Sequence, residues 1–86
     1  MPSYEIVFAR SARKELQALS RTVAKRILEK VELLVLNPRP SGCKKLRGHS
    51  SLWRLRVGEY RVIYSIDDDK RVVDVSVVRH RSEAYR

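Results

Sequence analysis

The chain has 86 residues, which is enough for one small domain with a single modest core, so we expect residues 1–86 to fold as one unit. Its 19 lysines and arginines outnumber 10 acidic residues, and the resulting net charge of +9 favours an anionic partner such as RNA, DNA or an acidic protein. One cysteine excludes a disulfide framework and a four-thiolate zinc site. Because no segment has the length and apolar character of a membrane span, we expect a soluble cytoplasmic protein without membrane contact.

The first half of the sequence predicts one strand followed by two helices. In residues 4–8 alternation places Tyr4, Ile6 and Phe8 on one side, which is typical of a strand, and we expect this strand to pair with a later one. Ser11 is a suitable N-cap for a short helix, and Ser20 is one for a second helix of about 15 residues that ends before Pro38. The second helix has an apolar stripe that must be buried, formed by Val23, Ile27, Val31, Leu34 and Val35.

Residues 37–51 are rich in proline, glycine, serine and lysine, and they predict a connecting loop. The loop is long for a compact domain, and long loops are often functional. Its basic residues Lys44, Lys45 and Arg47 are candidates for phosphate binding. A solvated connection without a function fits the same composition.

The segment LWRLRVGEYRVIY, residues 52–64, predicts a hairpin with one apolar and one basic face. A tight turn at Gly58-Glu59 pairs Val57 with Tyr60 and Arg56 with Arg61. Because side chains alternate across a strand, the apolar face contains Trp53, Leu55, Val57, Tyr60, Val62 and Tyr64. The other face contains Arg54, Arg56 and Arg61.

The two opposed arginines indicate an anion site on the basic face. Like charges that face each other across two strands destabilise a sheet by up to about 1 kcal/mol. The pairing of Arg56 with Arg61 therefore makes better sense if a polyanion neutralises it. The alternative is a basic face that is only solvated.

A last strand at residues 72–79 follows an acidic turn and completes the order β-α-α-β-β-β. This order predicts an α+β domain with two N-terminal helices packed on a mainly antiparallel sheet. The three aspartates of the turn, residues 67–69, diverge in direction, so we expect no metal site there. The chain closes with RHRSEAYR, which can fold over the arginine face or remain a frayed basic tail.

These residues offer the chemistry for RNA cleavage without a metal or another cofactor. Arginine holds phosphate oxygens bidentately and stays protonated, so it stabilises charge but does not transfer protons. His80 and Tyr85 are the candidate proton carriers, since neighbouring cations favour a phenolate, and Glu83 and His49 are weaker candidates. We find no glycine-rich phosphate loop and no context for a cysteine or serine nucleophile.

The segment KKLRGHSSLWRLRVGEYRVIYSI and the ending VVRHRSEAYR resemble the RelE branch of the RelE/ParE toxin superfamily. The resemblance covers nearly the whole chain and implies a RelE-like fold. It also implies a type II toxin that enters the ribosomal A site, cleaves the bound mRNA and is held inactive by a cognate RelB-like antitoxin. By this resemblance Arg61 and Arg79 hold the scissile phosphate, Arg54 and Arg56 supply positive field, and Tyr85 orients a base or exchanges a proton with the 2′-hydroxyl.

The chain departs from the branch at Arg54 and Arg56, where members often carry lysine. Arginine cannot lose its proton there, so proton transfer falls to Tyr85 or His80, and the resemblance does not divide acid and base between them.

The leading hypothesis is a metal-independent, ribosome-dependent endoribonuclease, or mRNA interferase, that leaves a 2′,3′-cyclic phosphate. Lys44, Lys45, Arg47 and Arg81 are further expected RNA contacts. Arg61→Ala is expected to abolish toxicity and to leave the fold intact, because the side chain points away from the predicted core. The alternatives are a ParE-like toxin that inhibits DNA gyrase without chemistry of its own and an RNA-binding module that does not cleave.

Overall fold

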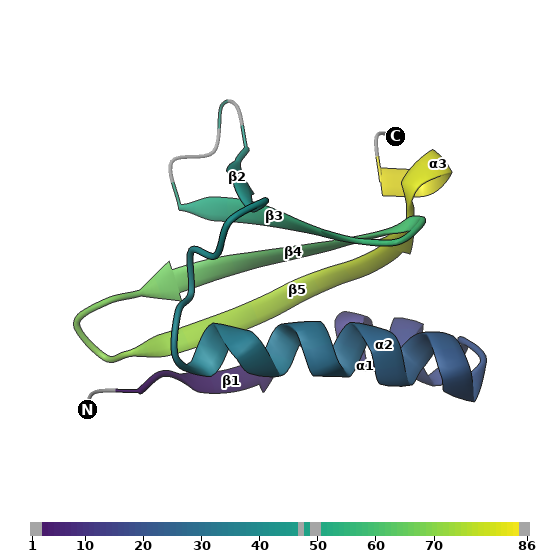
Figure 1. Ribbon diagram of the computed structural model, residues 1–86, viewed down its shortest axis with the longest axis horizontal. Helices are drawn as coiled ribbons and strands as arrows, with labels where there is room; N and C mark the ends of the chain where they lie inside the picture. Colours follow the sequence, from purple (N-terminus) through teal and green to yellow (C-terminus); the bar gives the residue numbers. More distant parts are fainter. Residues whose placement is uncertain (1–2, 47, 49–50, 85–86) are drawn as a thin grey trace.

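The computed structural model describes residues 3–46, 48 and 51–84, and in them it contains the predicted strands and both N-terminal helices. The elements are β1 (Glu5–Phe8), α1 (Arg10–Gln17), α2 (Arg21–Glu32), the 3₁₀ helix η1 (Leu33–Val35), β2 (Lys44–Lys45), β3 (Leu52–Val57), β4 (Tyr60–Asp67), β5 (Val72–His80) and α3 (Arg81–Ala84) (Figure 1). The prediction of an α+β domain is therefore confirmed.

Within the described residues the strands form one sheet in the order β1-β5-β4-β3-β2. β1 runs parallel to β5, whereas the pairs β5-β4, β4-β3 and β3-β2 are antiparallel. The first strand thus pairs with a later one, as predicted, and the sheet is mainly antiparallel. A tight turn cannot join two parallel strands, and here both helices and the other strands separate β1 from β5 in the chain.

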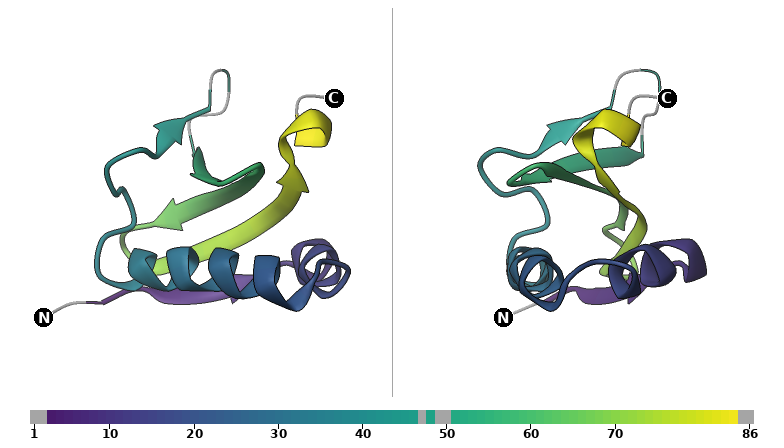
Figure 2. Two further views of the ribbon diagram at one scale, coloured as in Figure 1. Left: turned by 45° about the vertical axis from the view of Figure 1, so that its right-hand side comes forward. Right: turned by 90° about the vertical axis from the view of Figure 1, so that its right-hand side faces the viewer.

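The core lies between the helices and the inner face of the curved sheet. Figure 2 shows α1 and α2 together on one side of the molecule, with β2, β3 and α3 farthest from them. The stripe predicted for the second helix is buried at Ile27, Val31 and Leu34. Ser20 caps α2, since its Oγ accepts a hydrogen bond from the Val23 N–H at 3.3 Å. The sheet contributes buried side chains from its inner face, namely Leu55, Val57, Val62, Tyr64, Val73, Val75 and Val78.

Ser11 does not cap the first helix, so that part of the prediction is wrong. α1 begins at Arg10, and its N-cap residue, Ala9, supplies no side-chain hydrogen bond. Ser11 lies in the first turn, where its hydroxyl donates to the Ser76 carbonyl of β5 at 3.3 Å. Because α1 packs against β5, the hydroxyl serves the contact between the two elements and does not serve the helix end.

Two short elements occur where the sequence predicts a loop and a tail. β2 has 2 residues and pairs Lys44 with Arg54 and Lys45 with Trp53. α3 has 4 residues and begins directly after β5. Both elements are too short to show a hydrophobic period, so a reading of periodicity cannot find them.

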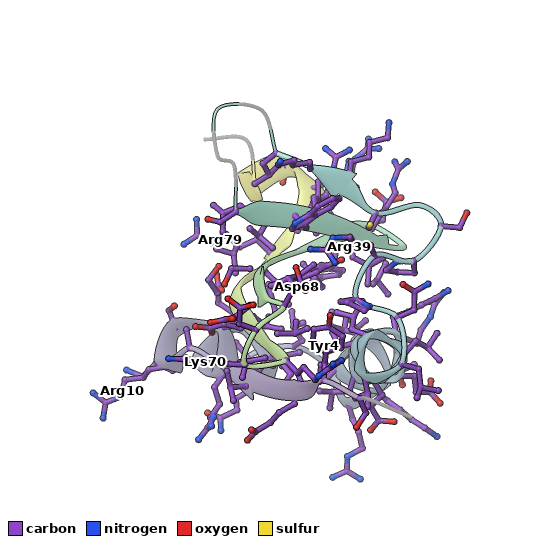
Figure 3. The ribbon with its side chains drawn as sticks, turned by 90° about the vertical axis from the view of Figure 1, so that its left-hand side faces the viewer. Tyr4, Arg10, Arg39, Asp68, Lys70 and Arg79 are labelled. Atoms are coloured by element: carbon purple, nitrogen blue, oxygen red, sulfur yellow. The ribbon has the colours of Figure 1, made fainter. Side chains whose placement is uncertain are left out.

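Asp68 in the turn between β4 and β5 fastens the loop that follows η1. Arg39 donates from Nη2 to Asp68 Oδ2 at 2.8 Å and from Nη1 to Oδ1 at 3.2 Å, and the Tyr4 hydroxyl donates to Oδ1 at 2.6 Å. Figure 3 shows Asp68 between Arg39 and Tyr4. The Arg39 guanidinium also lies over the ring of Trp53, 5.2 Å from its centroid. We call Tyr4, Arg39, Trp53 and Asp68 the loop clasp.

The hydrogen bonds from Arg39 and Tyr4 lower the pKa of Asp68 to about 2. Its carboxylate is therefore ionised at neutral pH and accepts all three hydrogen bonds of the loop clasp.

Candidate active site

Three arginines lie next to one another across β3, β4 and β5. Arg56 is the register partner of Arg61, and Arg61 is the register partner of Arg79. Register partners place their side chains on the same face of a sheet. The residues beside them, including Val57, Val62 and Val78, are buried in the core, so the three arginines face away from it. We call Arg56, Arg61 and Arg79 the arginine row.

The tight turn between β3 and β4 sets the first pair of the row. Val57 pairs with Tyr60 across the turn, and Gly58 has a φ of +59°, a conformation that glycine adopts without strain. The predicted partners of the hairpin are therefore confirmed, including Arg56 with Arg61.

A β-bulge brings Arg79 into the row. Val73 and Val75 face the core, and strict alternation would turn Arg79 toward the core as well. The register shifts at this point, because Tyr64 pairs with Val75 while Ile63 pairs with Val77, which leaves Ser76 as the extra residue. The bulge reverses the phase of β5, so Val78 enters the core and Arg79 joins Arg61.

Arg61 is buried although it lies on the basic face. Its exposed fraction is 7%, and its Nη1 atom is shielded from solvent. β4 has a strand on each side, so long arginine side chains flank Arg61 in both directions. Arg61 does point away from the core, as predicted, but its neighbours bury it, so Arg61→Ala removes a buried side chain and whether the fold stays intact remains a prediction.

Arg79 is held by an acidic residue of α1. Its Nε donates to Glu15 Oε2 at 2.6 Å, and the backbone N–H of Val78 donates to Glu15 Oε1 at 3.0 Å. The exposed fraction is 48% for the Arg79 side chain and 23% for that of Glu15. Sequence reasoning missed Glu15, although α1 gives one signal, a single acid in the basic segment RSARKELQ.

The other predicted RNA-binding residues lie on different parts of the sheet. Lys44 pairs with Arg54 and so extends the basic face, whereas Lys45 pairs with Trp53 and belongs to the opposite face. Both lysines are exposed, and Arg54 is partly buried. Arg47 lies outside the described residues.

The structure does not bring His80 together with the arginine row. β5 extends one residue beyond the predicted end, and alternation places His80 on the opposite face from Arg79. Its register partner is Tyr60, and the two rings meet edge to face with centroids 5.4 Å apart. His80 Nδ1 also accepts a hydrogen bond from the Ser82 N–H at 3.3 Å, so the ring is held at the start of α3.

The start of the C-terminal tail is fastened to the β3–β4 turn and is not frayed there. The Arg81 N–H donates to the Glu59 carbonyl at 2.7 Å, and Arg81 Nε lies 3.2 Å from the Glu59 carboxylate. Figures 1 and 2 show α3 beside this turn and away from α1 and α2. Tyr85 and the side chain of Glu83 lie outside the described residues, as does His49.

The comparisons with known proteins agree with this fold. The family model described as the ParE toxin of the type II toxin-antitoxin system parDE matches residues 6–85. The mRNA interferase toxin RelE of Escherichia coli K12 is 36% identical over 87 residues, which cover 96% of this chain and 90% of that protein. Toxin RelE of Mycobacterium tuberculosis is 35% identical over 85 residues, with 96% and 87% covered. The chain belongs to the RelE toxin family.

Solved structures extend the likeness from sequence to fold. This RelE family toxin superimposes on the crystal structure of the archaeal RelE-RelB complex from Pyrococcus horikoshii OT3 with a TM-score of 0.82. The two chains are 31% identical, and the match covers 96% of this chain and 99% of the other. Among the described residues of this RelE family toxin, no helix is long and apolar enough to cross a membrane.

Proposed function

We propose that this RelE family toxin is an mRNA interferase, a metal-independent endoribonuclease that cleaves mRNA in the ribosomal A site and so inhibits translation. The observation that carries the proposal is the arginine row, in which three guanidinium groups occupy adjacent register positions with Arg61 buried at the centre. A preorganised charge that water does not screen acts strongly on charge that develops in a transition state. Two relatives named mRNA interferase RelE support the same activity.

The proposed reaction uses the substrate's own 2′-hydroxyl as the nucleophile. The 2′-oxygen forms a bond to phosphorus, the bond from phosphorus to the 5′-oxygen breaks, and the products are a 2′,3′-cyclic phosphate and a 5′-hydroxyl. Arg61 and Arg79 hold the non-bridging oxygens and stabilise their developing charge, while Arg54, Arg56 and Lys44 attract the RNA backbone.

The 2′-hydroxyl loses one proton to an acceptor other than arginine, which stays protonated, and the leaving 5′-oxygen takes up one proton from solvent, so that protons balance. On the basis of the family resemblance we assign Tyr85, as the phenolate that neighbouring cations favour, to the acceptance of the 2′-hydroxyl proton. Its ring can also stack on the base of the cleaved nucleotide. His80 is left out of this assignment, because it packs against Tyr60 on the opposite face of β5.

The proposed partners are the ribosome with its mRNA and a RelB-like antitoxin, which places the protein in the cytoplasm. The solved complexes of RelE with RelB from Pyrococcus horikoshii and Escherichia coli support the antitoxin. An antitoxin with acidic side chains can compete with RNA for the arginine row, since both present negative charge to it.

The test is to incubate the purified protein with programmed ribosomes and to map mRNA 5′ ends by primer extension. A parallel reaction measures DNA supercoiling by gyrase. We expect cleavage within the A-site codon and unchanged supercoiling. The variant Arg61→Ala should lose this cleavage. Its matched control is Arg10→Ala, which also removes one arginine charge but from the exposed start of α1, away from Arg79 in Figure 3. Intact mRNA together with inhibited gyrase would overturn the proposal in favour of a ParE-like inhibitor.

A further inference from the structure

The Glu15 carboxylate contacts two successive residues of β5 at the edge of the candidate site. Oε1 accepts the Val78 N–H at 3.0 Å, and Oε2 accepts Arg79 Nε at 2.6 Å. The Glu15 side chain is 23% exposed and that of Arg79 is 48% exposed, so the pair lies at the partly solvated edge of the site. One acidic side chain therefore fixes both the strand and the arginine that the strand carries.

The position of Glu15 follows from the point at which β1 ends. Phe8, the last residue of β1, pairs with Val75, and the bulge at Ser76 follows directly. Beyond this point the chain of β1 turns away into α1. Glu15, on the second turn of α1, supplies to Val78 the acceptor that a neighbouring strand would otherwise supply.

The contact also sets the direction of the Arg79 guanidinium. A charge-assisted hydrogen bond of 2.6 Å at Nε fixes one edge of the planar group. With Nε bonded to the carboxylate, two parallel bonds from this group to a phosphate would come from its two Nη nitrogens. Without the carboxylate, the long side chain has many rotamers, and a displacement of about 1 Å of a group in a catalytic site can cost roughly 100-fold in rate.

We propose that Glu15 is a positioning residue, which orients Arg79 toward the scissile phosphate through Nε. This inference rests on the proposed function. Because a carboxylate repels RNA, an effect of Glu15 on the cleavage rate can be told apart from an effect on RNA binding. Removal of its charge should slow cleavage and leave RNA binding unchanged or tighter, whereas loss of an RNA-binding residue weakens binding.

The test compares Glu15→Gln, Arg79→Ala and the double variant in single-turnover cleavage on programmed ribosomes. Glutamine keeps an acceptor for the Val78 N–H but cannot offer a charged acceptor to Arg79 as well. The control is Glu32→Gln, which removes the same charge from an exposed position at the end of α2. The rate constant is measured at saturating protein, and the half-saturating protein concentration is measured separately.

We expect Glu15→Gln to lower the rate constant about 10- to 100-fold and to leave the half-saturating concentration unchanged or lower. The double variant should cleave no more slowly than Arg79→Ala, because the two side chains act as one unit. Additive losses would overturn the proposal, and so would an unchanged rate constant in Glu15→Gln. If the unsubstituted protein and the Glu32→Gln control both fail to cleave, the proposed function itself is wrong.

A second measurement uses the unsubstituted protein and does not depend on whether the variants fold. In a ¹⁵N-labelled sample, the Arg79 Hε should exchange with water much more slowly than the Hε of exposed arginines such as Arg10 and Arg21. Equal exchange rates would show that Glu15 does not hold Arg79 in solution, and the proposal would be overturned.

Discussion

The loop clasp and the arginine row both contain arginine, and they differ in the residues beside it, since Arg39 lies in a loop against Asp68 whereas the row has arginine on three adjacent strands. In the clasp, Arg39 meets Asp68 through two hydrogen bonds and lies over Trp53. In the row, Arg61 has an arginine at the register position on each side. Glu15 offsets part of the charge at Arg79, but three arginines at adjacent register positions still repel one another. The clasp therefore stabilises the fold, whereas the row is the proposed binding site for an anionic ligand.

Arg61 lies at the centre of the row, and its loss should have the largest effect. Arg61→Ala should lower the rate constant for mRNA cleavage about 100- to 1,000-fold, because a buried, preorganised charge is removed. It should also lower the melting temperature, since the side chain is buried. Arg61→Lys keeps the charge but loses the planar fork, so its cleavage rate should be intermediate. Full cleavage by Arg61→Ala would show that the row is not the site.

Arg79→Ala should have the next largest effect, a loss of about 100-fold in the rate constant, since one of two phosphate-binding groups is lost. The side chain is 48% exposed, so the melting temperature should change little. This pattern separates Arg79 from Arg61, where catalysis and stability fall together. A large fall in melting temperature for Arg79→Ala would mean that its contact with Glu15 mainly supports the fold.

Asp68→Asn should lower the melting temperature and leave the rate constant for cleavage unchanged, which is the opposite of the result expected for Arg79→Ala. The folded pKa of Asp68 is lowered to about 2 from its usual 3.8, so the ionised carboxylate stabilises the fold at neutral pH. That contribution is present above about pH 4 and is lost as the pH falls toward 2. Melting temperatures measured from pH 6 to pH 2 should therefore converge for the variant and the unsubstituted protein. A constant difference would refute a charged clasp.

His80→Phe should have the smallest effect, with cleavage within about threefold of the unsubstituted protein, because His80 lies on the face opposite to the row and the new ring can keep the contact with Tyr60. The measurement is the single-turnover rate constant across pH 5 to 9. A loss of several orders of magnitude would instead identify His80 as a proton carrier and would require the tail to rearrange on the ribosome.

Most of the fold can be predicted from the sequence, because its local signals agree with one another. The turn at Gly58-Glu59 fixes the register of the first hairpin, and Ser20 marks the start of α2. The predicted helical stripe is also the buried one. The short β2 and α3 cannot be predicted in this way, because each is held by residues elsewhere in the chain. β2 pairs with Trp53 and Arg54 of β3, and the start of α3 is bonded to Glu59.

The candidate site is less predictable, because part of it depends on the β-bulge in β5 and part on a contact between residues far apart in the chain. Arg56 and Arg61 follow from alternation and the turn. Arg79 does not, since it has the same spacing as Val73 and Val75 and joins the row through the bulge. Glu15 is separated from Val78 by 63 residues and from Arg79 by 64, so no local pattern reveals the contact.

The bond between Glu15 and the Val78 N–H also affects how one molecule meets another. β1 accompanies β5 only to Val75 within the described residues, and an uncovered strand edge can add a strand from a second chain. At Val78 that edge carries a carboxylate that already accepts its N–H. A strand from a second molecule would have to displace this charged group from its hydrogen bonds in order to pair with β5. The side chain proposed to orient Arg79 therefore also opposes edge-to-edge pairing of β5 with another molecule.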